Sequence, residues 1–445
     1  MIFRGFKMLQ KRIGIRREDI NKWERRVPLI PTHVRELIRG HSLEIYVQPS
    51  DIRVFPDGDY LMEGVRVQED ISPCPFIFAI KEIPIETLEK DKVYTFFSHT
   101  AKGQPHNMPM LKRMMELGCS IIDYEKIVNE KGQRLLFFGG YAGQAGMIDT
   151  LWALGRRLKL EGIETPFLRL EKAVNYSSLV EAKEEVAEVG RLIQKKGLPP
   201  QMTPFVCGFM GYGHVSQGAQ EMFDLLPSEE VSPRDLPGLF TNGRPAARGL
   251  YKVVFKEEDI VKPIDSGRAF DLQDYYVNPQ NYTPVMEGHL QYLTVLIVGI
   301  YWTPKFPKFI TKPFLRKIYG GESAPRLRVI GDITCDIDGS VECTVQATDS
   351  ENPVYVFDAE TDRALTGIEG KGPVVMAVYN LPAELPLESS TYFSGGLKKY
   401  VPAIVAADFR GEFSRCELPP EVQKAVILYR GKLTPAYAYL SPFVS

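Results

Sequence analysis

Residues 204–226 read PFVCGFMGYGHVSQGAQEMFDLL, and this stretch decides the fold. Its pattern predicts a short apolar strand from Phe205 to Cys207, a glycine-rich turn and an amphipathic helix. Glycines at positions 211, 213 and 218 remove side chains where the backbone turns tightly and approaches a ligand closely. A helix that begins at such a turn directs free N–H groups and the positive end of its dipole at an anion. The pyrophosphate of a dinucleotide is the anion that this combination predicts.

The match to the dinucleotide-binding fingerprint is incomplete. Ser216 replaces the third glycine of G-x-G-x-x-G, and the next small residues are Gly218 and Ala219. A glycine turn that only joins a strand to a helix is therefore the alternative interpretation. We favour nucleotide binding, and the cofactor contacts predicted in this turn and helix are Gly211, Gly213, His214, Val215 and Gly218.

The composition is that of an ordinary globular protein. The chain has 445 residues, of which 44% are hydrophobic and 25% charged, and this length suggests two or three domains. The net charge is −2 and no block of lysine or arginine occurs, so we expect no nucleic-acid partner. No apolar run reaches the roughly 18–20 residues of a membrane helix, so we expect no membrane partner. Six scattered cysteines form no C-x-x-C pair, which favours reduced thiols and argues against a metal site.

The first 17 residues, MIFRGFKMLQKRIGIRR, are basic and contain no acidic residue. A mitochondrial presequence is one interpretation, but the segment is short, lacks serine and runs into a predicted strand at 13–15. We therefore expect a native N-terminus and no secretion signal. The expected location is the cytoplasm, or the mitochondrial matrix if the protein is eukaryotic.

The first 145 residues alternate strand and helix. Apolar strands are predicted at 43–47, 76–80, 93–97 and 119–123, and helices at 32–40, 57–64 and 107–118. Alternating units of this kind predict a parallel sheet. Further along, helices are predicted at 141–162 and 179–197 and strands at 249–255, 293–298 and 327–333, with a loop at 306–327. Beyond about residue 386 the pattern is helical again.

These patterns predict an α/β fold of two Rossmann-like domains with parallel sheets and a cleft between them. The substrate domain is expected to comprise residues 1–148, completed by helices within 387–445. The dinucleotide-binding domain is expected to comprise residues 149–386. Two crossings between the domains predict hinge closure, which would exclude water from the reaction.

Several polar residues follow predicted strands and are candidates for chemistry. Lys81 ends FIFAIK, His99 ends VYTFFSH, and Asp332 and Asp336 lie near the end of RVIGDITCD. Ligands of parallel sheets bind at the carboxyl ends of the strands, so these side chains are expected to face one cleft. Lysine and histidine are readily tuned for proton transfer, which makes Lys81 and His99 the predicted catalytic pair. A solvated strand-end lysine and a hydrogen-bonded core histidine are the alternatives.

Arg26 follows the first strand, and its guanidinium is suited to clamp a carboxylate. By composition alone, its neighbour Arg25 fits equally well. Glu125 is a candidate partner for Lys81 or for a substrate ammonium, and Arg134 is a second carboxylate ligand. Each of these residues is alternatively a surface charge.

The chain resembles the lysine-forming saccharopine dehydrogenases, also called lysine–ketoglutarate reductases. Within that group it looks similar to the reductase half of the bifunctional aminoadipic semialdehyde synthases of animals and plants. The segments that carry the resemblance run from about residue 13 to the C-terminus and include NKWERRVPLIPTHV, FAIKEIP, FFSHTAKGQPHNMPML, FFGGYAGQAGMIDTLWALGRRL, MGYGHVSQGAQEMFDLLP, GIYWTPKFP and GDITCDIDGSVE. The fold implied is similar to that of alanine dehydrogenase and of the soluble transhydrogenase domain. We expect the activity of the second half, which oxidises saccharopine, to be absent from these residues.

The resemblance implies roles for individual residues. Lys81 and His99 match the acid–base pair, Arg26 matches a carboxylate-binding arginine, and Glu125 and Arg134 match positions that line the lysine and oxoglutarate site. Asp336 matches an aspartate near the reacting nitrogen. Tyr301, Asn380 and Leu381 match segments that pass the nicotinamide. One departure is Val298, where the family pattern has asparagine before GIYW, which puts one amide contact to the cofactor in doubt.

The reaction implied is the reductive condensation of lysine with 2-oxoglutarate to saccharopine, the first step of lysine degradation. NADP(H) is the favoured cofactor because the animal and plant relatives prefer it, and NAD(H) is the alternative. The residues themselves do not decide, since Lys256 and Glu257 lie side by side after the second strand. Rival functions are another amino-acid dehydrogenase of this fold, a transhydrogenase-like binding subunit and a catalytically silent lysine sensor. The expected partners are the two small-molecule substrates, and homo-oligomer formation is left open.

Overall fold

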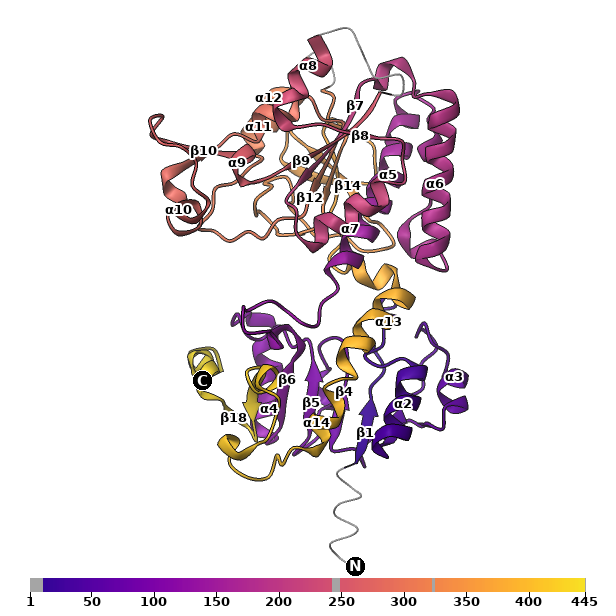
Figure 1. The fold of residues 1–445 in the computed structure, drawn as a ribbon, viewed down its shortest axis with the longest axis vertical. Coiled ribbons are helices and arrows are strands. Elements are labelled where there is room, and N and C mark those ends of the chain that lie inside the picture. The colour runs from indigo at the N-terminus through magenta and orange to yellow at the C-terminus, as the bar shows by residue number, and fades with distance from the viewer. Residues whose placement is uncertain (1–10, 242–248, 322–324, 445) are drawn as a thin grey trace, which may run out of the picture. The chain divides into compact units, whose positions relative to one another are not determined.

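The computed structural model of this protein describes residues 11–241, 249–321 and 325–444 and divides the chain into two compact units (Figure 1). Unit 1 comprises Met1–Phe138 and Pro386–Ser445, and unit 2 comprises Gly139–Leu385. The predicted boundary between residues 148 and 149 falls inside one continuous helix, α5 (Gly139–Leu160). The basic segment at residues 1–10 lies outside the described residues. No helix within the described ranges is long and apolar enough to cross a membrane.

Unit 1 is built on an eight-stranded sheet with the order β18-β17-β6-β5-β4-β1-β2-β3. The pairs from β6 to β3 are parallel, as the sequence predicts, because helices and loops connect successive strands. The strands are β1 (Arg12–Ile15), β2 (Glu44–Val47), β3 (Arg66–Val67), β4 (Phe76–Phe78), β5 (Val93–Phe96), β6 (Ser120–Asp123), β17 (Val426–Tyr429) and β18 (Lys432–Leu433). The helices are α2 (Pro31–His41), α3 (Asp57–Met62), α4 (Met108–Glu116), α13 (Pro386–Leu397), α14 (Val401–Ala406), α15 (Pro420–Gln423) and α16 (Ser441–Val444).

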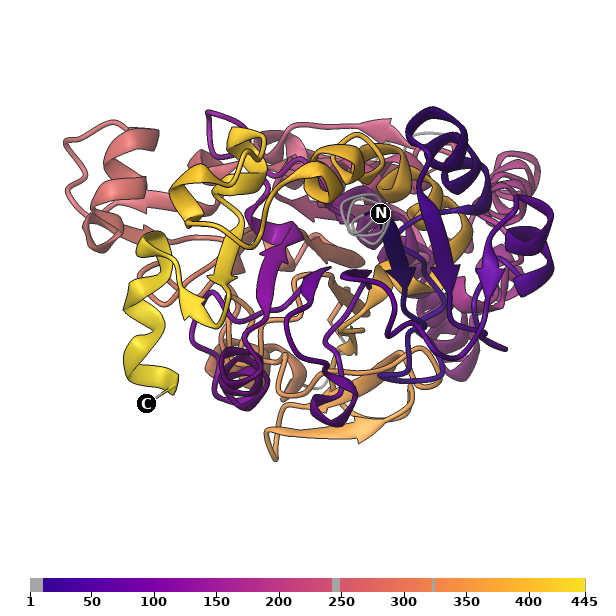
Figure 2. The same ribbon diagram turned by 90° about the horizontal axis from the view of Figure 1, so that it is seen from below.

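The C-terminal segment adds strands to this sheet, which corrects the prediction that it supplies only helices. The segment PPEVQKAVILYRG begins with the short helix α15 and continues as β17, which pairs antiparallel with β6. All four residues of β17 are buried, so the apolar run VILY is a core strand. Figure 2 shows the yellow C-terminal strands beside the purple β6.

Unit 2 contains a second eight-stranded sheet, ordered β15-β14-β16-β13-β12-β7-β9-β8. Its central strands β16, β13, β12, β7 and β9 pair in parallel, whereas β14 and β15 are antiparallel. The strands are β7 (Phe205–Met210), β8 (Glu229–Glu230), β9 (Leu250–Phe255), β12 (Val295–Val298), β13 (Val329–Asp332), β14 (Val354–Asp358), β15 (Arg363–Thr366) and β16 (Val374–Met376). A separate hairpin joins β10 (Val261–Pro263) to β11 (Tyr282–Pro284).

Helices cover both faces of the second sheet, as in a doubly wound fold. Alternate residues of β7 enter different cores: Phe205 and Phe209 pack with α5, α6 and α7, whereas Val206 and Met210 pack on the other face. The helices on the first face are α5, α6 (Leu179–Lys196) and α7 (His214–Phe223), and the other elements of the unit include α8 (Leu236–Thr241), α9 (Glu257–Ile260), α10 (Leu272–Val277), α11 (Glu287–Leu290) and α12 (Lys312–Tyr319).

Helix α12 corrects the prediction of a loop at 306–327. Its local start signal is ThrLysPro at 311–313: the Thr311 hydroxyl accepts the N–H of Phe314 at 3.4 Å, and a proline occupies the first turn. Leu315 is fully buried and anchors the helix to the sheet. The lysine- and proline-rich composition concealed this short amphipathic helix.

Candidate active site

The sheet of unit 1 brings Lys81 and His99 to one edge. Strands β4 and β5 are neighbours in parallel register, with Phe78 opposite Thr95, and each candidate lies shortly beyond the carboxyl end of its strand. Both side chains are partly buried. The predicted juxtaposition of the two residues within one domain therefore follows from the strand order.

Glu82 links the two candidate residues, and sequence analysis missed it. Its Oε1 lies 2.5 Å from Nδ1 of His99. Burial would raise the pKa of Glu82, but the hydrogen bond from His99 and the positive charges of His99 and Lys81 together lower it. A carboxylate only accepts hydrogen bonds, so Nδ1 carries the proton and Nε2 is the ring nitrogen left for proton exchange.

The backbone of His99 is held in an unusual conformation. Its φ is 48°, in the left-handed region that non-glycine residues rarely adopt. The side-chain amide of Asn107 donates to the His99 carbonyl at 3.2 Å, and the imidazole stacks on Phe97 with an interplanar angle of 19°. Strained conformations of this kind gather at functional sites, where the surrounding structure maintains them.

Lys81 lies in a cluster of charged groups. Burial lowers the pKa of its ammonium, and the nearby charge of Arg26 lowers it further, while three carboxylates oppose this shift. These carboxylates belong to Glu82, Glu24 and Glu18. A lysine whose pKa is lowered by burial gives up its proton more readily, which suits a proton-transfer group.

Arg26, the predicted carboxylate clamp, is paired with a carboxylate of the chain itself. Its Nε and one terminal nitrogen donate to the two carboxylate oxygens of Glu24 at 2.7 and 2.6 Å, and both residues are buried. The guanidinium also lies 4.4 Å above the ring of Phe138. Arg25 is partly buried and donates to the carbonyl of Ile52 at 3.3 Å.

Glu125 and Arg134 pair with each other at 2.5 Å. The hydrogen-bond partner of Glu125 in this structure is thus Arg134, and the carboxylates that act on the Lys81 ammonium include Glu82, Glu24 and Glu18. Asp123 supports this corner of the site: it is fully buried and accepts hydrogen bonds from the N–H of Glu125 and the hydroxyl of Ser98.

The glycines of this segment of unit 2 have two different structural roles. Gly211 follows β7 with a φ of 99°, and a Cβ there would lie 2.9 Å from the side chain of Ile300, so this position requires glycine. Gly213 precedes α7, and a Cβ there would meet no atom within 4 Å among the described residues. His214 is exposed at the first turn of α7, and Val215 follows it.

Gly218 packs two helices together. A Cβ at this position would lie 2.9 Å from the carbonyl carbon of Gly140 and nearer still to its oxygen, so α7 can approach α5 only through a glycine. Gly143 makes the reciprocal close approach to the backbone of Val215. Gly218 thus sets the distance between α7 and α5.

The remaining candidates of unit 2 differ in exposure. Asp332 is buried and is bound by the hydroxyls of Thr334 and Thr344, both at 2.5 Å, whereas Asp336 is exposed. Tyr301 is 79% exposed. Asn380 and Leu381 are both buried.

A pocket at the carboxyl ends of β7, β9 and β12 is lined by aromatic rings and by Lys256 and Glu257. The two oxygens of Glu257 accept hydrogen bonds from Tyr276 at 2.6 Å and from Tyr212 at 3.1 Å. Lys256 is exposed. Aromatic walls and a carboxylate at the end of the second strand suit the adenosine half of a dinucleotide.

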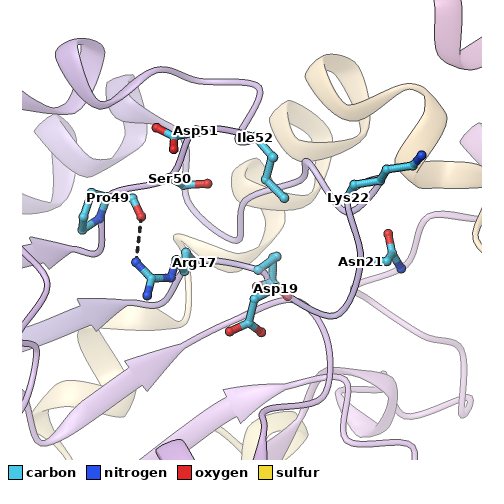
Figure 3. Close-up of a pocket in the computed structure, with 9 residues that line it drawn as sticks. Arg17, Asp19, Asn21, Lys22, Pro49, Ser50, Asp51 and Ile52 are labelled. Carbon is cyan, nitrogen blue, oxygen red and sulfur yellow. Dashed lines mark hydrogen bonds between the residues drawn. The ribbon is translucent and has the colours of Figure 1, made fainter.

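A second pocket, in unit 1, opens between the loops at 17–22 and 49–52 (Figure 3). Arg17 spans it with a hydrogen bond of 3.4 Å to the carbonyl of Pro49. The charged ends of Asp19, Lys22 and Asp51 point in different directions, so they do not converge on a single ligand.

Comparisons with known proteins agree with this architecture. Residues 14–145 match the family model of the Alanine dehydrogenase/PNT, N-terminal domain. The chain is 37% identical over 445 residues to an alpha-aminoadipic semialdehyde synthase of Arabidopsis thaliana, and 35% identical over 442 residues to the mitochondrial alpha-aminoadipic semialdehyde synthase of Bos taurus. Each match covers 96% of this chain but only 41% and 47% of the relatives, so the chain spans less than half their length.

More distant relatives extend the comparison. A saccharopine dehydrogenase of Emericella nidulans, named as NAD(+)-dependent and L-lysine-forming, is 24% identical and covers 86% of this chain and 89% of its own length. Among solved structures, an L-alanine dehydrogenase aligns with a TM-score of 0.62 at 17% identity, covering 98% of this chain and all of that one. A transhydrogenase of Sinorhizobium meliloti aligns with a TM-score of 0.58 at 14% identity, covering 95% of this chain and all of that one. The predicted resemblance and the predicted α/β fold class are confirmed.

Proposed function

We propose that this protein condenses lysine with 2-oxoglutarate and reduces the product to saccharopine. The observation that carries the proposal is the Lys81–Glu82–His99 cluster at the carboxyl edge of the first sheet. The similarity to the aminoadipic semialdehyde synthases supports this choice among dehydrogenase reactions.

Proton transfer is the first requirement of this chemistry. Only the free ε-amine of lysine attacks a keto carbon, so a base must take the proton of the ammonium, and an acid must later protonate the departing hydroxyl. Lys81, whose pKa is lowered by burial, and His99, which is oriented by Glu82, are the two groups proposed for this work. The second oxygen of Glu82, Oε2, is buried and has no hydrogen-bond partner among the described residues, which suits a position beside a substrate ammonium.

Substrate carboxylates require fixed cations. We assign this role to Arg134, which is half-exposed, and to Arg26, which would exchange part of its pairing with Glu24 for a substrate carboxylate. Glu125 is proposed to orient Arg134 beside the substrates, and Asp336 to approach the reacting nitrogen. These roles rest on the resemblance.

A nicotinamide dinucleotide fits the turn of unit 2. The open space beside Gly213 and the left-handed backbone of Gly211 form a cradle for a phosphate group at the start of α7. We propose that Gly211, Gly213, His214 and Val215 hold the pyrophosphate, with Gly218 setting the position of the helix. Tyr301, Asn380 and Leu381 are proposed to adjoin the nicotinamide, which when bound supplies the hydride that reduces the imine.

NADPH is the proposed donor, with NADH as the alternative. Both oxygens of Glu257 already accept hydrogen bonds from Tyr212 and Tyr276, which reduces their capacity to bind a ribose hydroxyl. Lys256 provides an exposed cation at the same strand end, suited to a 2′-phosphate. Steady-state rates with each reduced nucleotide test this preference.

The test of the reaction follows the absorbance of NADPH while substrates are omitted in turn. We expect oxidation only when lysine and 2-oxoglutarate are both present. Oxidation with ammonia in place of lysine would favour another amino-acid dehydrogenase, and binding of lysine without turnover would favour a sensor. The compartment, proposed as the cytoplasm or the mitochondrial matrix, is tested by fractionation of the source cells, and the oligomeric state by light scattering.

A further inference from the structure

The carboxyl group of Glu18 accepts two hydrogen bonds from the backbone at Ile80 and Lys81. Its Oε1 accepts the N–H of Ile80 at 2.6 Å, and its Oε2 accepts the N–H of Lys81 at 2.9 Å. The side chain comes from the loop after β1, which pairs directly with β4, and it is buried with 6% of its surface exposed. A single carboxyl group therefore ties two neighbouring strand ends together.

These hydrogen bonds matter because the chain leaves the sheet after β4. The carbonyl of Ile80 still accepts the N–H of Phe97 from the neighbouring strand at 3.0 Å, and Ala79 donates to the carbonyl of Thr95 at 3.1 Å. The N–H groups of Ile80 and Lys81 point to the other side, where Glu18 takes both. Buried N–H groups without a partner cost free energy, so the carboxyl group fixes the chain direction at this point.

We infer that Glu18 is a positioning residue that fixes Lys81 and Glu82 in the geometry used for proton transfer. The inference rests on the proposed function, because Lys81 and the Glu82–His99 pair are the proton-transfer groups proposed above. Glu18 acts through the backbone of residues 80 and 81, whereas Glu82 contacts His99 directly.

The charges around Glu18 provide a readout that a purely structural role would not affect. Four titratable groups interact electrostatically with it: Arg16, Glu24, Lys81 and Tyr124. Burial, followed by the charge of Glu24, raises the pKa of Glu18 to about 8, against the two N–H bonds and Arg16. Above about pH 8, where Glu18 is ionised, its charge raises the pKa of Lys81, so Glu18→Gln should lower the pH at which Lys81 loses its proton.

Lys92, which precedes β5, offers a matched control because it binds the backbone at the amino end of β4. Its buried ammonium donates to the carbonyls of Ser72 and Cys74, which precede β4. Lys92→Met therefore removes a buried charged group that also holds two backbone groups, but it leaves the carboxyl end of β4 untouched. Both substitutions should lower the stability of the fold, but only substitutions of Glu18 should change the position and the titration of Lys81.

The experiment compares wild type, Glu18→Ala, Glu18→Gln and Lys92→Met. We expect Glu18→Ala to lower kcat/KM for lysine about ten- to hundredfold, because displacing a catalytic group by about 1 Å has effects of this size. Glu18→Gln should recover part of the loss, since its amide oxygen still accepts one N–H. Lys92→Met should stay within about twofold of wild type. Labelling of Lys81 by an amine-reactive reagent, quantified by peptide mass spectrometry across pH, should proceed at lower pH in Glu18→Gln.

The outcomes separate this inference from the proposed function. Wild-type kcat/KM in Glu18→Ala, or an equal loss in Lys92→Met, would overturn the inference. If wild type lacks the proposed activity, the proposed function fails, and the labelling profile alone decides on Glu18. A labelling profile that is identical in wild type and Glu18→Gln would then overturn the positioning role.

Discussion

Gly218→Ala offers a quantitative test of how α7 is placed. A Cβ at position 218 would lie 2.9 Å from the carbonyl carbon of Gly140, whereas unstrained carbon atoms approach to about 3.5–4.0 Å. The obstacle is backbone, which cannot rotate away, so α7 must move from α5 by roughly 1 Å. Overpacking of this kind costs up to about 3 kcal/mol, and the better helix propensity of alanine returns about 1 kcal/mol. We therefore expect a net destabilisation of about 2 kcal/mol.

Thermal unfolding measures this effect. For a unit of this size, a loss of about 2 kcal/mol lowers the midpoint by roughly 4–8 °C. Gly213→Ala is the matched control, because its Cβ would meet open space and its extended backbone accommodates alanine. That variant should unfold within about 1 kcal/mol of wild type but bind NADPH about ten- to hundredfold more weakly, since its methyl group enters the phosphate cradle. Wild-type stability in Gly218→Ala, or strong destabilisation in Gly213→Ala, would refute the reasoning.

Three further predictions concern charge. Lys81→Met should lower kcat by about 10²–10⁴ with little change in NADPH affinity, and turnover near that of wild type would remove Lys81 from the mechanism. Lys256→Glu should shift the ratio of kcat/KM values from NADPH toward NADH, and an unchanged ratio would show that the 2′-phosphate is recognised elsewhere. The pKa of Glu18 is raised from 4.5 to about 8 on folding, so the folded state holds its proton more tightly and loses stability as pH rises through that window. Denaturant titrations should therefore show wild type losing stability relative to Glu18→Gln between about pH 5 and 8, and parallel curves would contradict this.

The elements that could be predicted from the sequence carry their signals locally. The turn at Gly211 and Gly213 and the strands before Lys81 and His99 are marked by glycines and apolar runs a few residues long. The strand β17 was missed because a fully buried apolar run has no alternation to distinguish it from a buried helix. Its assignment depends on pairing with β6, some 300 residues earlier in the chain.

The contacts within the site could not be predicted from the sequence for the same reason, since they join residues far apart in the chain. Glu18 reaches residues 80 and 81 across more than 60 positions, and nothing in the spacing of REDINKWERR marks its partner. Glu82 carried a signal, since it adjoins Lys81 directly, but its contact with His99 depends on the register of β4 and β5. The pairing of Arg26 with Glu24 shows that residue type alone does not reveal whether a guanidinium is already engaged.

The central claim is that this chain joins lysine to 2-oxoglutarate and reduces the new carbon–nitrogen bond. Its most direct measurement is mass spectrometry of the product formed from the two substrates and NADPH deuterated at the transferred position. We predict saccharopine with one deuterium on the carbon that was the keto carbon of 2-oxoglutarate. Deuterated glutamate formed from ammonia, or consumption of the nucleotide without any lysine-containing product, would contradict the proposal.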